Sequence, residues 1–367
     1  GSLCGANVSL LLREMGITKP LLVAGERTKN VFFARTGMRL PVFDAFHPNP
    51  DLQDCVAGAA LYQEKVRVQQ ANISVGGGSA MDTAKGIKAL LMTDIAHVRA
   101  NQLPLEGNVP HLAIPGTAGT GAETTAVAVL YEDGRKLSVD HPALLPDGVL
   151  LDGSLLDTLP EYHRKSCAMD ALAQGIESWW AKKATPGSRI HAEYAIRGVL
   201  DNLTAYLQGD RKAQDEMLHA AYESGAAILT TRTTAAHAMS YQITKKLGAA
   251  HGHACMLTLP HLWAHLAAQA EYRPMLTELS RILGGEKPMD GAMLLKGLLA
   301  VLELDKIPMP DDATLDMLAA SVNPERLGNH PEALTTAQLR AIYVQAFTPM
   351  TDTERAEAIA AWEQYGK

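Results

Sequence analysis

The segment GGGSAMDTAK, residues 76–85, decides the fold predicted for this chain. Its three glycines follow a short apolar run, residues 73–75, and lead into a stretch with helical composition. Glycine lets a backbone approach an anion closely, and the start of a helix presents free N–H groups, so this order of elements favours a phosphate site. Ser79 is expected to cap the helix and Asp82 to lie in its first turn. The alternative is an ordinary strand-to-helix turn that binds no ligand.

The same order of strand, glycine turn and helix recurs on either side of this segment. Residues 21–24 form an apolar run that ends at Gly25, and residues 112–114 form another that ends in Pro-Gly. Helices are expected at residues 51–69 and 80–92. This alternation predicts a parallel β-sheet covered by helices, with ligands bound at the carboxyl ends of the strands.

A second glycine-rich loop, PGTAGTGAETT at residues 115–125, follows the last of these strands and offers several small hydroxyl groups. Alone it is equally typical of a glycine-rich connection, but two such loops in one half favour a nucleotide site. Neither loop has the G-x-G-x-x-G spacing of an ordinary Rossmann fold. The residues predicted to bind the cofactor are Gly25, Gly77, Gly78, Ser79, Asp82, Gly116, Thr117, Thr120 and Lys136.

The second half of the chain has a different pattern. After an apolar run at residues 149–151, long Ala- and Leu-rich stretches with helical spacing predict an all-helical region. Residues 289–303 and 336–347 are expected to be amphipathic packing helices. The predicted organisation is an α/β dinucleotide-binding domain at residues 1–158 and an all-helical domain, holding metal and substrate, at residues 159–367.

The composition excludes several functional classes. Hydrophobic residues make up 47% and charged residues 20%, which is too apolar for a disordered chain. A net charge of -7 argues against nucleic acid as the main partner, and no apolar run is long enough to span a membrane. The four cysteines show no C-x-x-C spacing, as expected of free thiols in the cytoplasm. The sequence therefore predicts a soluble cytoplasmic protein that acts on a small molecule.

Four side chains in the helical half form a candidate metal site. Asp170 and Gln174 are four residues apart and would share one helix face. His237 and His251 follow further along the chain. A carboxylate, an amide oxygen and two imidazoles would hold a divalent ion and leave a position open for substrate. The alternative is that these histidines are ordinary core or surface residues.

Five motifs in the same order link most of the chain to a known family. They are GGGSAMDTAK, PGTAGTGAETT, LLPDGVLLD at residues 144–152, MDALAQGIES at 169–178 and HAMSYQITKKLGAAHGHA at 237–254. The chain resembles the iron-containing (group III) alcohol dehydrogenases. The resemblance implies a homodimer-prone, NAD(P)-dependent alcohol dehydrogenase or aldehyde reductase. It also implies that Fe²⁺ or Zn²⁺ is held by Asp170, the position of Gln174, His237 and His251.

Three departures from the family pattern bear on the metal and the cofactor, and Gly116 and Ala122 are milder replacements of the more usual Thr and Ser. Gln174 stands where a histidine ligand is usual, so metal occupancy is open. Tyr241 stands where many members have a histidine near the nicotinamide. Gly25 replaces the aspartate of NAD-using members, and Arg27 or Lys29 would pair with a 2'-phosphate, which favours NADP(H) over NAD(H).

The expected mechanism is metal-assisted hydride transfer, with Tyr241 or His253 supplying the alcohol proton. Without the ion, Tyr241 and His237 would have to polarise the carbonyl alone. Residues 231–241 and 250–254 are similar to the phosphonoacetaldehyde reductase branch and to a branch that oxidises an octulosonate sugar acid. Arg232 lies five residues before His237 and would bind an anionic substrate, although a surface or dimer contact explains it equally well. The predicted substrate is a small anionic aldehyde, first of all phosphonoacetaldehyde. Alternatives are a sugar-acid alcohol oxidase, a dehydroquinate-synthase-like or glycerol-phosphate-dehydrogenase-like enzyme, or a nucleotide-binding homologue that has lost its metal and turnover.

Overall fold

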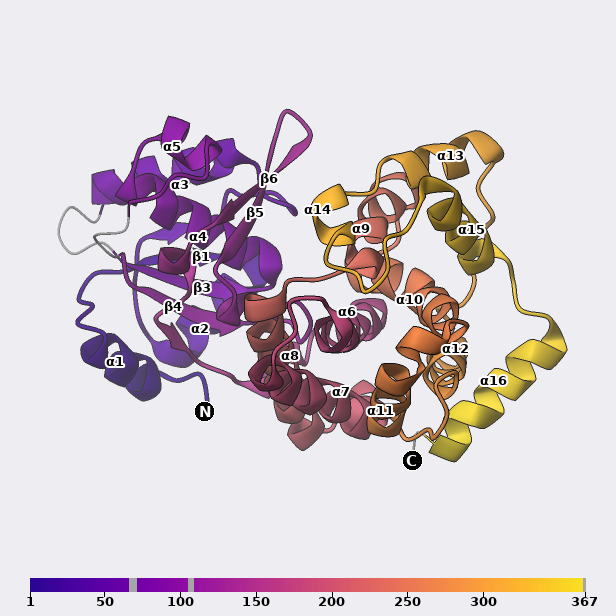
Figure 1. Ribbon diagram of the computed structural model, residues 1–367. Coiled ribbons are helices and arrows are strands. Elements are labelled where there is room, and N and C mark those ends of the chain that lie inside the picture. Colours follow the sequence, from indigo (N-terminus) through magenta and orange to yellow (C-terminus); the bar gives the residue numbers. More distant parts are fainter. Residues whose placement is uncertain (66–70, 105–108, 366–367) are drawn as a thin grey trace. The chain divides into compact units, whose positions relative to one another are not determined.

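The computed structural model describes residues 1–65, 71–104 and 109–365, which form two compact units, Gly1–Thr158 and Leu159–Lys367 (Figure 1). The first unit is built on a sheet and the second on helices. None of the helices described for these residues is long and apolar enough to cross a membrane.

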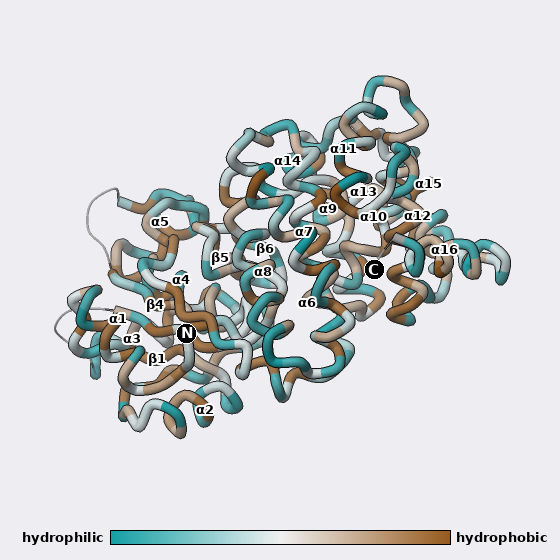
Figure 2. Tube along the Cα trace, turned by 90° about the horizontal axis from the view of Figure 1, so that it is seen from below, coloured by the Kyte–Doolittle hydropathy of each residue, from teal (hydrophilic) through white to brown (hydrophobic). Residues whose placement is uncertain are grey.

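The first unit contains a five-stranded sheet in the order β2-β1-β3-β4-β7, and every neighbouring pair is parallel. Its strands are β1 (Leu21–Ala24), β2 (Val42–Phe43), β3 (Asn72–Gly76), β4 (His111–Pro115) and β7 (Gly148–Val149). The strands β1, β3 and β4 are buried throughout. Figure 2 colours the chain by hydropathy, and β1 consists of hydrophobic residues alone. The parallel sheet predicted from the glycine turns is confirmed.

Helices cover both faces of this sheet. The helices in the described part of the unit are α1 (Gly5–Glu14), α2 (Glu26–Thr36), α3 (Leu52–Lys65), α4 (Gly78–Met92) and α5 (Ile95–Arg99). On one face, Leu21 and Val23 pack in a core with residues of α3, α4 and α5. On the other face, Leu22 and Ala24 pack in a core with residues of α1 and α2. Successive side chains of a strand point to opposite faces, which is why β1 contributes to both cores.

An antiparallel hairpin that the sequence analysis did not predict completes the unit. Its strands β5 (Val127–Glu132) and β6 (Arg135–Asp140) pair over their full length. Asp133 and Gly134 join them with φ of 51° and 72°, the left-handed values that a two-residue hairpin turn requires. Short 3-10 turns lie at η1 (Ala122–Thr124), η2 (Pro142–Leu144) and η3 (Gly153–Leu156).

The second unit is helical over its described residues, as predicted. Its α-helices are α6 (Glu161–Trp180), α7 (Pro186–Leu207), α8 (Arg211–Thr231), α9 (Ala235–Gln242), α10 (His251–Ala267), α11 (Arg273–Leu283), α12 (Asp290–Val301), α13 (Asp312–Ala320), α14 (Pro324–Leu327), α15 (Thr336–Phe347) and α16 (Asp352–Tyr365). A short π-helix, η4 (Ile243–Leu247), and a 3-10 turn, η5 (Ala270–Tyr272), join some of them.

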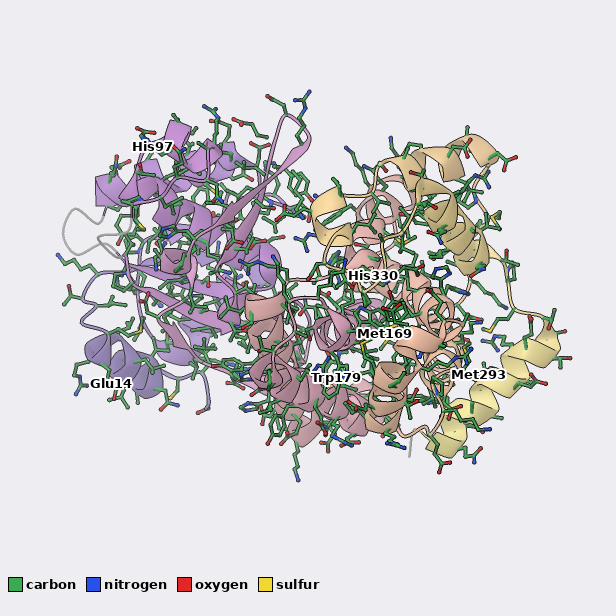
Figure 3. The ribbon with its side chains drawn as sticks, in the orientation of Figure 1. Glu14, His97, Met169, Trp179, Met293 and His330 are labelled. Atoms are coloured by element: carbon green, nitrogen blue, oxygen red, sulfur yellow. The ribbon has the colours of Figure 1, made fainter. Side chains whose placement is uncertain are left out.

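Helix α6 is the centre of this unit. It packs against α7, α8 and α10, and nearly all its residues from Ala168 to Trp180 are fully buried. Met169 and His330, both labelled in Figure 3, lie in this interior. A helix buried on all sides has few places for polar side chains, so the polar residues that α6 does carry need partners from its neighbours.

Several sequence predictions of local structure need correction. Ser79 does not cap α4, because Gly77 is the N-cap residue and the Ser79 hydroxyl instead accepts a hydrogen bond from the Asn49 N–H at 3.1 Å. Asp82 is the fifth residue of α4 and lies beyond its first turn. The helix expected at residues 51–69 is α3, and residues 66–69 lie outside the described part of the chain.

Candidate functional site

Four potential metal ligands from three helices meet inside the helical unit. Asp170 comes from α6, His237 from α9, and His251 and Cys255 from α10. One donor atom from each lies within 4.8 Å of the others. We call these four residues the donor cluster. His237 Nε2 lies 3.1 Å and His251 Nε2 lies 3.6 Å from Asp170 Oδ1, so both imidazoles face one carboxylate oxygen.

A glycine allows close contact between α6 and α10, the two longest helices that contribute to the donor cluster. A Cβ atom on Gly252 of α10 would lie only 1.8 Å from the Ser166 carbonyl oxygen and 2.8 Å from the Asp170 Cβ. No side chain fits in this space, so α10 approaches α6 at backbone distance. His251, the first residue of α10, is thereby held beside Asp170.

The buried carboxylate of Glu177 orients His237. Its Oε2 contacts His237 Nδ1, and its Oε1 accepts hydrogen bonds from the backbone N–H groups of Thr234 and His237, both at 3.2 Å. The Thr234 hydroxyl donates to the same oxygen at 2.8 Å. Burial alone would raise the pKa of Glu177, but these contacts with His237 and Thr234 lower it. A charged Glu177 on Nδ1 leaves Nε2 of His237 directed at the donor cluster.

Glu177 and Cys255 were not among the residues predicted from the sequence, although a signal for each was present. Glu177 follows Asp170 by seven residues, two helical turns, and so falls on the same face of α6. Cys255 follows His251 by four residues on α10, and its Sγ lies 3.8 Å from His251 Nε2. Burial opposes ionisation of this thiol, but the His237 and His251 imidazoles lower its pKa to about 7.

Gln174 lies beside the donor cluster, with its amide nitrogen toward Asp170 and its amide oxygen toward Ser224. Its Nε2 lies 3.4 Å from Asp170 Oδ1, and its Oε1 accepts a hydrogen bond from the Ser224 hydroxyl at 2.8 Å. Gln174 and Asp170 therefore lie side by side as predicted, but the amide oxygen that was expected to bind a metal faces Ser224.

The donor set suits a divalent metal ion. A carboxylate, two imidazoles and a thiol are the ligand types that zinc and related metals take from proteins. All four side chains except His251 are buried, and buried charges of this kind need either mutual pairing or a cation. The cluster therefore fits a metal on chemical grounds.

The two glycine-rich loops of the first unit lie against each other. The Gly116 N–H donates to the Gly76 carbonyl at 2.7 Å, directly across from β3 to β4. A Cβ on Gly77 would lie 3.1 Å from the Thr117 side chain, and one on Gly78 would lie 3.2 Å from that of Thr120. The residues predicted to form one phosphate cradle are thus brought together at the carboxyl ends of these strands, where α4 begins.

The other predicted cofactor residues lie around this cradle or beyond it. Gly25 is the N-cap of α2, and a Cβ there would meet nothing within 4 Å. Burial raises the pKa of Asp82 to about 6, against the opposing effects of Lys85 and Lys136. Lys136 lies on β6 and is close enough to act on this carboxylate.

The family models match both units. The model described as iron-containing alcohol dehydrogenase matches residues 1–153, and the C-terminal model of the Fe-containing alcohol dehydrogenase family matches residues 165–347. The chain belongs to the iron-containing alcohol dehydrogenase family. Members of this family are oxidoreductases that act on CH–OH groups, and membership supports NAD(H) as cofactor, a metal, and a small-molecule substrate.

Individual iron-containing alcohol dehydrogenases resemble the chain along most of its length. A phosphonoacetaldehyde reductase of Streptomyces viridochromogenes is 31% identical over 80% of this chain and 80% of its own. Long-chain-alcohol dehydrogenase 1 of Geobacillus thermodenitrificans is 30% identical, with 75% and 74% covered. The solved sulfoacetaldehyde reductase of Bifidobacterium kashiwanohense, in complex with NAD+, is 25% identical, with a TM-score of 0.84 and 94% and 95% covered.

Tyr241, one of the residues that depart from the family pattern, lies next to the donor cluster. Its ring stacks on that of His251 with the centroids 6.4 Å apart. The Arg326 guanidinium lies 5.8 Å from the centroid of the same ring and donates to the Thr233 hydroxyl. Arg326 was not predicted from the sequence, because α14 is remote from Tyr241 along the chain and only the tertiary fold brings the two together.

Two further predicted residues make contacts of their own. His253 is not part of the donor cluster. Its Nδ1 lies 2.9 Å from the Tyr162 hydroxyl and its Nε2 lies 2.7 Å from the Leu304 carbonyl oxygen. Arg232 ends α8 with φ of 63° and donates from Nη1 to the Leu229 carbonyl at 2.9 Å. Their roles as proton donor and anion ligand stay predictions.

Proposed function

We propose that this chain reduces a small anionic aldehyde, phosphonoacetaldehyde or a close analogue, with a nicotinamide cofactor and a divalent metal held by Asp170, His237 and His251. The observation that carries the proposal is the buried donor cluster with Tyr241 and Arg326 at its side. Two relatives act on aldehydes of this kind, one bearing a phosphonate and the other a sulfonate by name.

The anionic end of the substrate is the part that Arg326 would bind. Its guanidinium is half-buried and fixed between the Thr233 hydroxyl and the face of Tyr241. A planar guanidinium pairs well with phosphonate or sulfonate oxygens, and the Tyr241 ring that it lies over stacks on His251 of the donor cluster. Arg232 remains the second candidate for this role.

Tyr241 would donate the proton that converts the reduced carbonyl to an alcohol. Burial raises the pKa of Tyr241, so its hydroxyl stays protonated at neutral pH and is available as an acid. When bound, the metal would supply Lewis-acid polarisation of the carbonyl and the cofactor would supply the hydride. Glu177 would keep His237 in the orientation that ligation needs.

The cofactor would lie with its pyrophosphate on the cradle formed by Gly77, Gly78, Gly116, Thr117 and Thr120. NAD(H) is the form we propose. The basic residues expected to bind a 2'-phosphate are engaged elsewhere. Lys29 pairs with Glu26 and Asp44 at 2.8 and 2.7 Å. Arg27 donates to the Thr158 hydroxyl at 2.6 Å. The prediction of NADP(H) is tested by comparing kcat/KM for the two cofactors.

A homodimer is proposed from the family alone. Ile190 and Tyr194, one turn apart on α7, are 59% and 65% exposed. They are the positions to substitute when the proposed homodimer contact is tested. Light scattering of the purified protein tests the oligomeric state.

Cofactor oxidation with matched aldehydes tests the proposed activity. We expect kcat/KM with phosphonoacetaldehyde to exceed that with propionaldehyde by about tenfold or more, the effect of one charge-assisted hydrogen bond. His237→Ala should abolish turnover and metal binding, whereas His163→Ala, an exposed histidine of α6, should preserve both. Equal rates on neutral and anionic aldehydes would overturn the substrate assignment. Tight cofactor binding without turnover on any aldehyde would instead favour the homologue that has lost catalysis.

A further inference from the structure

The side chain at position 174, where family members usually place a ligand, does not direct an oxygen at the donor cluster. Gln174 turns its Nε2 toward Asp170 Oδ1 at 3.4 Å, and an amide N–H₂ group is a hydrogen-bond donor to a carboxylate, not a metal ligand. The carbonyl oxygen of the same amide faces the Ser224 hydroxyl on α8. If the site keeps the four protein ligands that the family pattern implies, the fourth comes from another side chain.

Cys255 is placed to be that donor. It lies one helical turn after His251, so both side chains leave the same face of α10. Its Sγ is 3.8 Å from His251 Nε2 and within 4.8 Å of the donor atoms of Asp170 and His237. The side chain is fully buried, so the thiol meets the cluster and not solvent.

We propose that Cys255 Sγ is the fourth protein ligand of the metal, in place of residue 174. The donor set is then one carboxylate, two imidazoles and one thiolate, and the number of ligands that the family pattern implies is preserved. This inference rests on the proposed function, in which Asp170, His237 and His251 hold a metal.

The exchange of an imidazole for a thiolate changes which metal the site prefers. Thiolate is a soft ligand that zinc binds strongly, and zinc also stands above iron in the general order of divalent affinities. A site with this donor set should therefore bind zinc in preference to ferrous iron when both ions are present.

X-ray absorption at the zinc edge reports the ligands without reference to activity. The purified full-length protein is stripped with a chelator, reloaded with zinc and measured. A sulfur ligand lies at about 2.3 Å from zinc and nitrogen or oxygen ligands at about 2.0–2.2 Å, so one sulfur in four is resolved. Cobalt loading gives a second readout, the thiolate-to-cobalt charge-transfer band in the near ultraviolet.

Four variants make the assignment specific. Cys255→Ser and Cys255→Ala should lose the sulfur scattering and the cobalt band, and should bind zinc at least about tenfold more weakly. Cys167→Ser, which removes another thiol from the same unit, should retain both signals. Gln174→Leu should also retain the sulfur scattering, because its amide is not a ligand.

The outcomes separate this inference from the proposed function. Stoichiometric zinc with only nitrogen and oxygen neighbours in the unsubstituted protein would overturn the role of Cys255 and leave the metal-assisted reduction standing. Loss of zinc in Gln174→Leu, with no effect of Cys255→Ser, would assign the fourth position to the amide. Failure of the unsubstituted protein to bind any divalent metal would overturn both proposals together.

Discussion

Glu177 and His237 form a fully buried pair in which the carboxylate contacts Nδ1 of the ring while Nε2 faces Asp170. The same carboxylate accepts the backbone N–H of His237, so it fixes both the ring and the start of α9. The imidazole thus enters the donor cluster in one orientation, set by a residue outside it.

Replacing Glu177 with Gln should weaken metal binding without removing a ligand. Loss of an outer carboxylate that orients a ligating histidine typically costs 10–100-fold in metal affinity, and we expect about that loss here. Zinc competition with a chromophoric chelator measures it. Glu223→Gln is the matched control, because Glu223 pairs with the exposed His191 on the surface of the same unit. Equal effects of the two variants would contradict a specific role for Glu177.

Removing the hydroxyl of Tyr241 should slow turnover and leave metal affinity unchanged. Positioned acid catalysis contributes about 10²–10⁴-fold, so Tyr241→Phe should lower kcat by roughly 10²-fold with little change in zinc affinity. Steady-state kinetics and zinc competition give the two numbers. Tyr194→Phe, at an exposed position on α7, serves as control. Unchanged kcat in Tyr241→Phe would assign the proton donor elsewhere, with His253 the next candidate.

Arg326 should discriminate between charged and neutral substrates. Its replacement by Gln removes the guanidinium beside Tyr241, so kcat/KM for phosphonoacetaldehyde should fall about tenfold or more while that for propionaldehyde stays within about twofold. Arg197→Gln, which breaks an exposed pair with Glu193, should alter neither. An equal loss of kcat/KM for both aldehydes would indicate that Arg326 stabilises the local structure around Thr233 and does not bind the substrate anion. Repeating the comparison with Arg232→Gln decides between the two arginines.

The phosphate cradle should not tolerate a side chain at Gly77. The added Cβ of Gly77→Ala would press on Thr117 at 3.1 Å and occupy the surface that a pyrophosphate approaches. We expect the Kd for NAD(H), read from cofactor fluorescence, to rise about tenfold with a small change in Tm. Gly86→Ala provides the contrast, because its Cβ would lie 2.4 Å from Cys55 Sγ in the core. It should cost about 1–3 kcal/mol of stability, and a similar loss in Gly77→Ala would mean that Gly77 serves packing.

Glu123 should make the stability of the protein depend on pH. It is 2% exposed, and its Oε1 has no hydrogen-bond partner in the described part of the chain. Burial raises the pKa of Glu123 from 4.5 to about 7. Between these values the folded state keeps a proton that the unfolded state has lost, so stability falls as pH rises from about 4.5 to 7.

Glu123→Gln should abolish this part of the pH dependence. Relative to the unsubstituted protein, the variant should gain roughly 2–3 kcal/mol between pH 4.5 and pH 8, measured by urea unfolding. Glu14→Gln is the control, since Glu14 ends α1 with an exposed side chain, seen in Figure 3. A constant difference between Glu123→Gln and its parent at the two pH values would show that the carboxylate ionises as freely in the fold as outside it.

Much of the fold could be predicted because its signals are local. Strands β1, β3 and β4 are short apolar runs bounded by glycine, and α15 occupies the residues expected of it, Thr336–Phe347. The hairpin β5–β6 was missed even though Asp133-Gly134 is a strong turn signal. Its strands are only half buried, so they lack the continuous apolar runs on which the other strands were recognised.

The donor cluster could be predicted only in part. Asp170, His237 and His251 lie within motifs that are contiguous in sequence, and the structure brings them together as expected. Arg326 reaches Tyr241 across 85 residues, a proximity that no spacing rule contains. The direction of the Gln174 amide is equally invisible in sequence, because it depends on Ser224 from another helix.

The close approach at Gly252 has a consequence for anyone who wishes to graft this centre onto another scaffold. The donor atoms of His251 and Asp170 come within reach because α10 and α6 touch backbone to backbone at a residue that contributes no ligand and no hydrogen-bonding side chain. Four donors copied onto helices at the usual spacing of 8–10 Å would not meet in the same way. A graft should therefore first reproduce the close crossing of α6 and α10 at its glycine, because the ligand positions depend on that crossing.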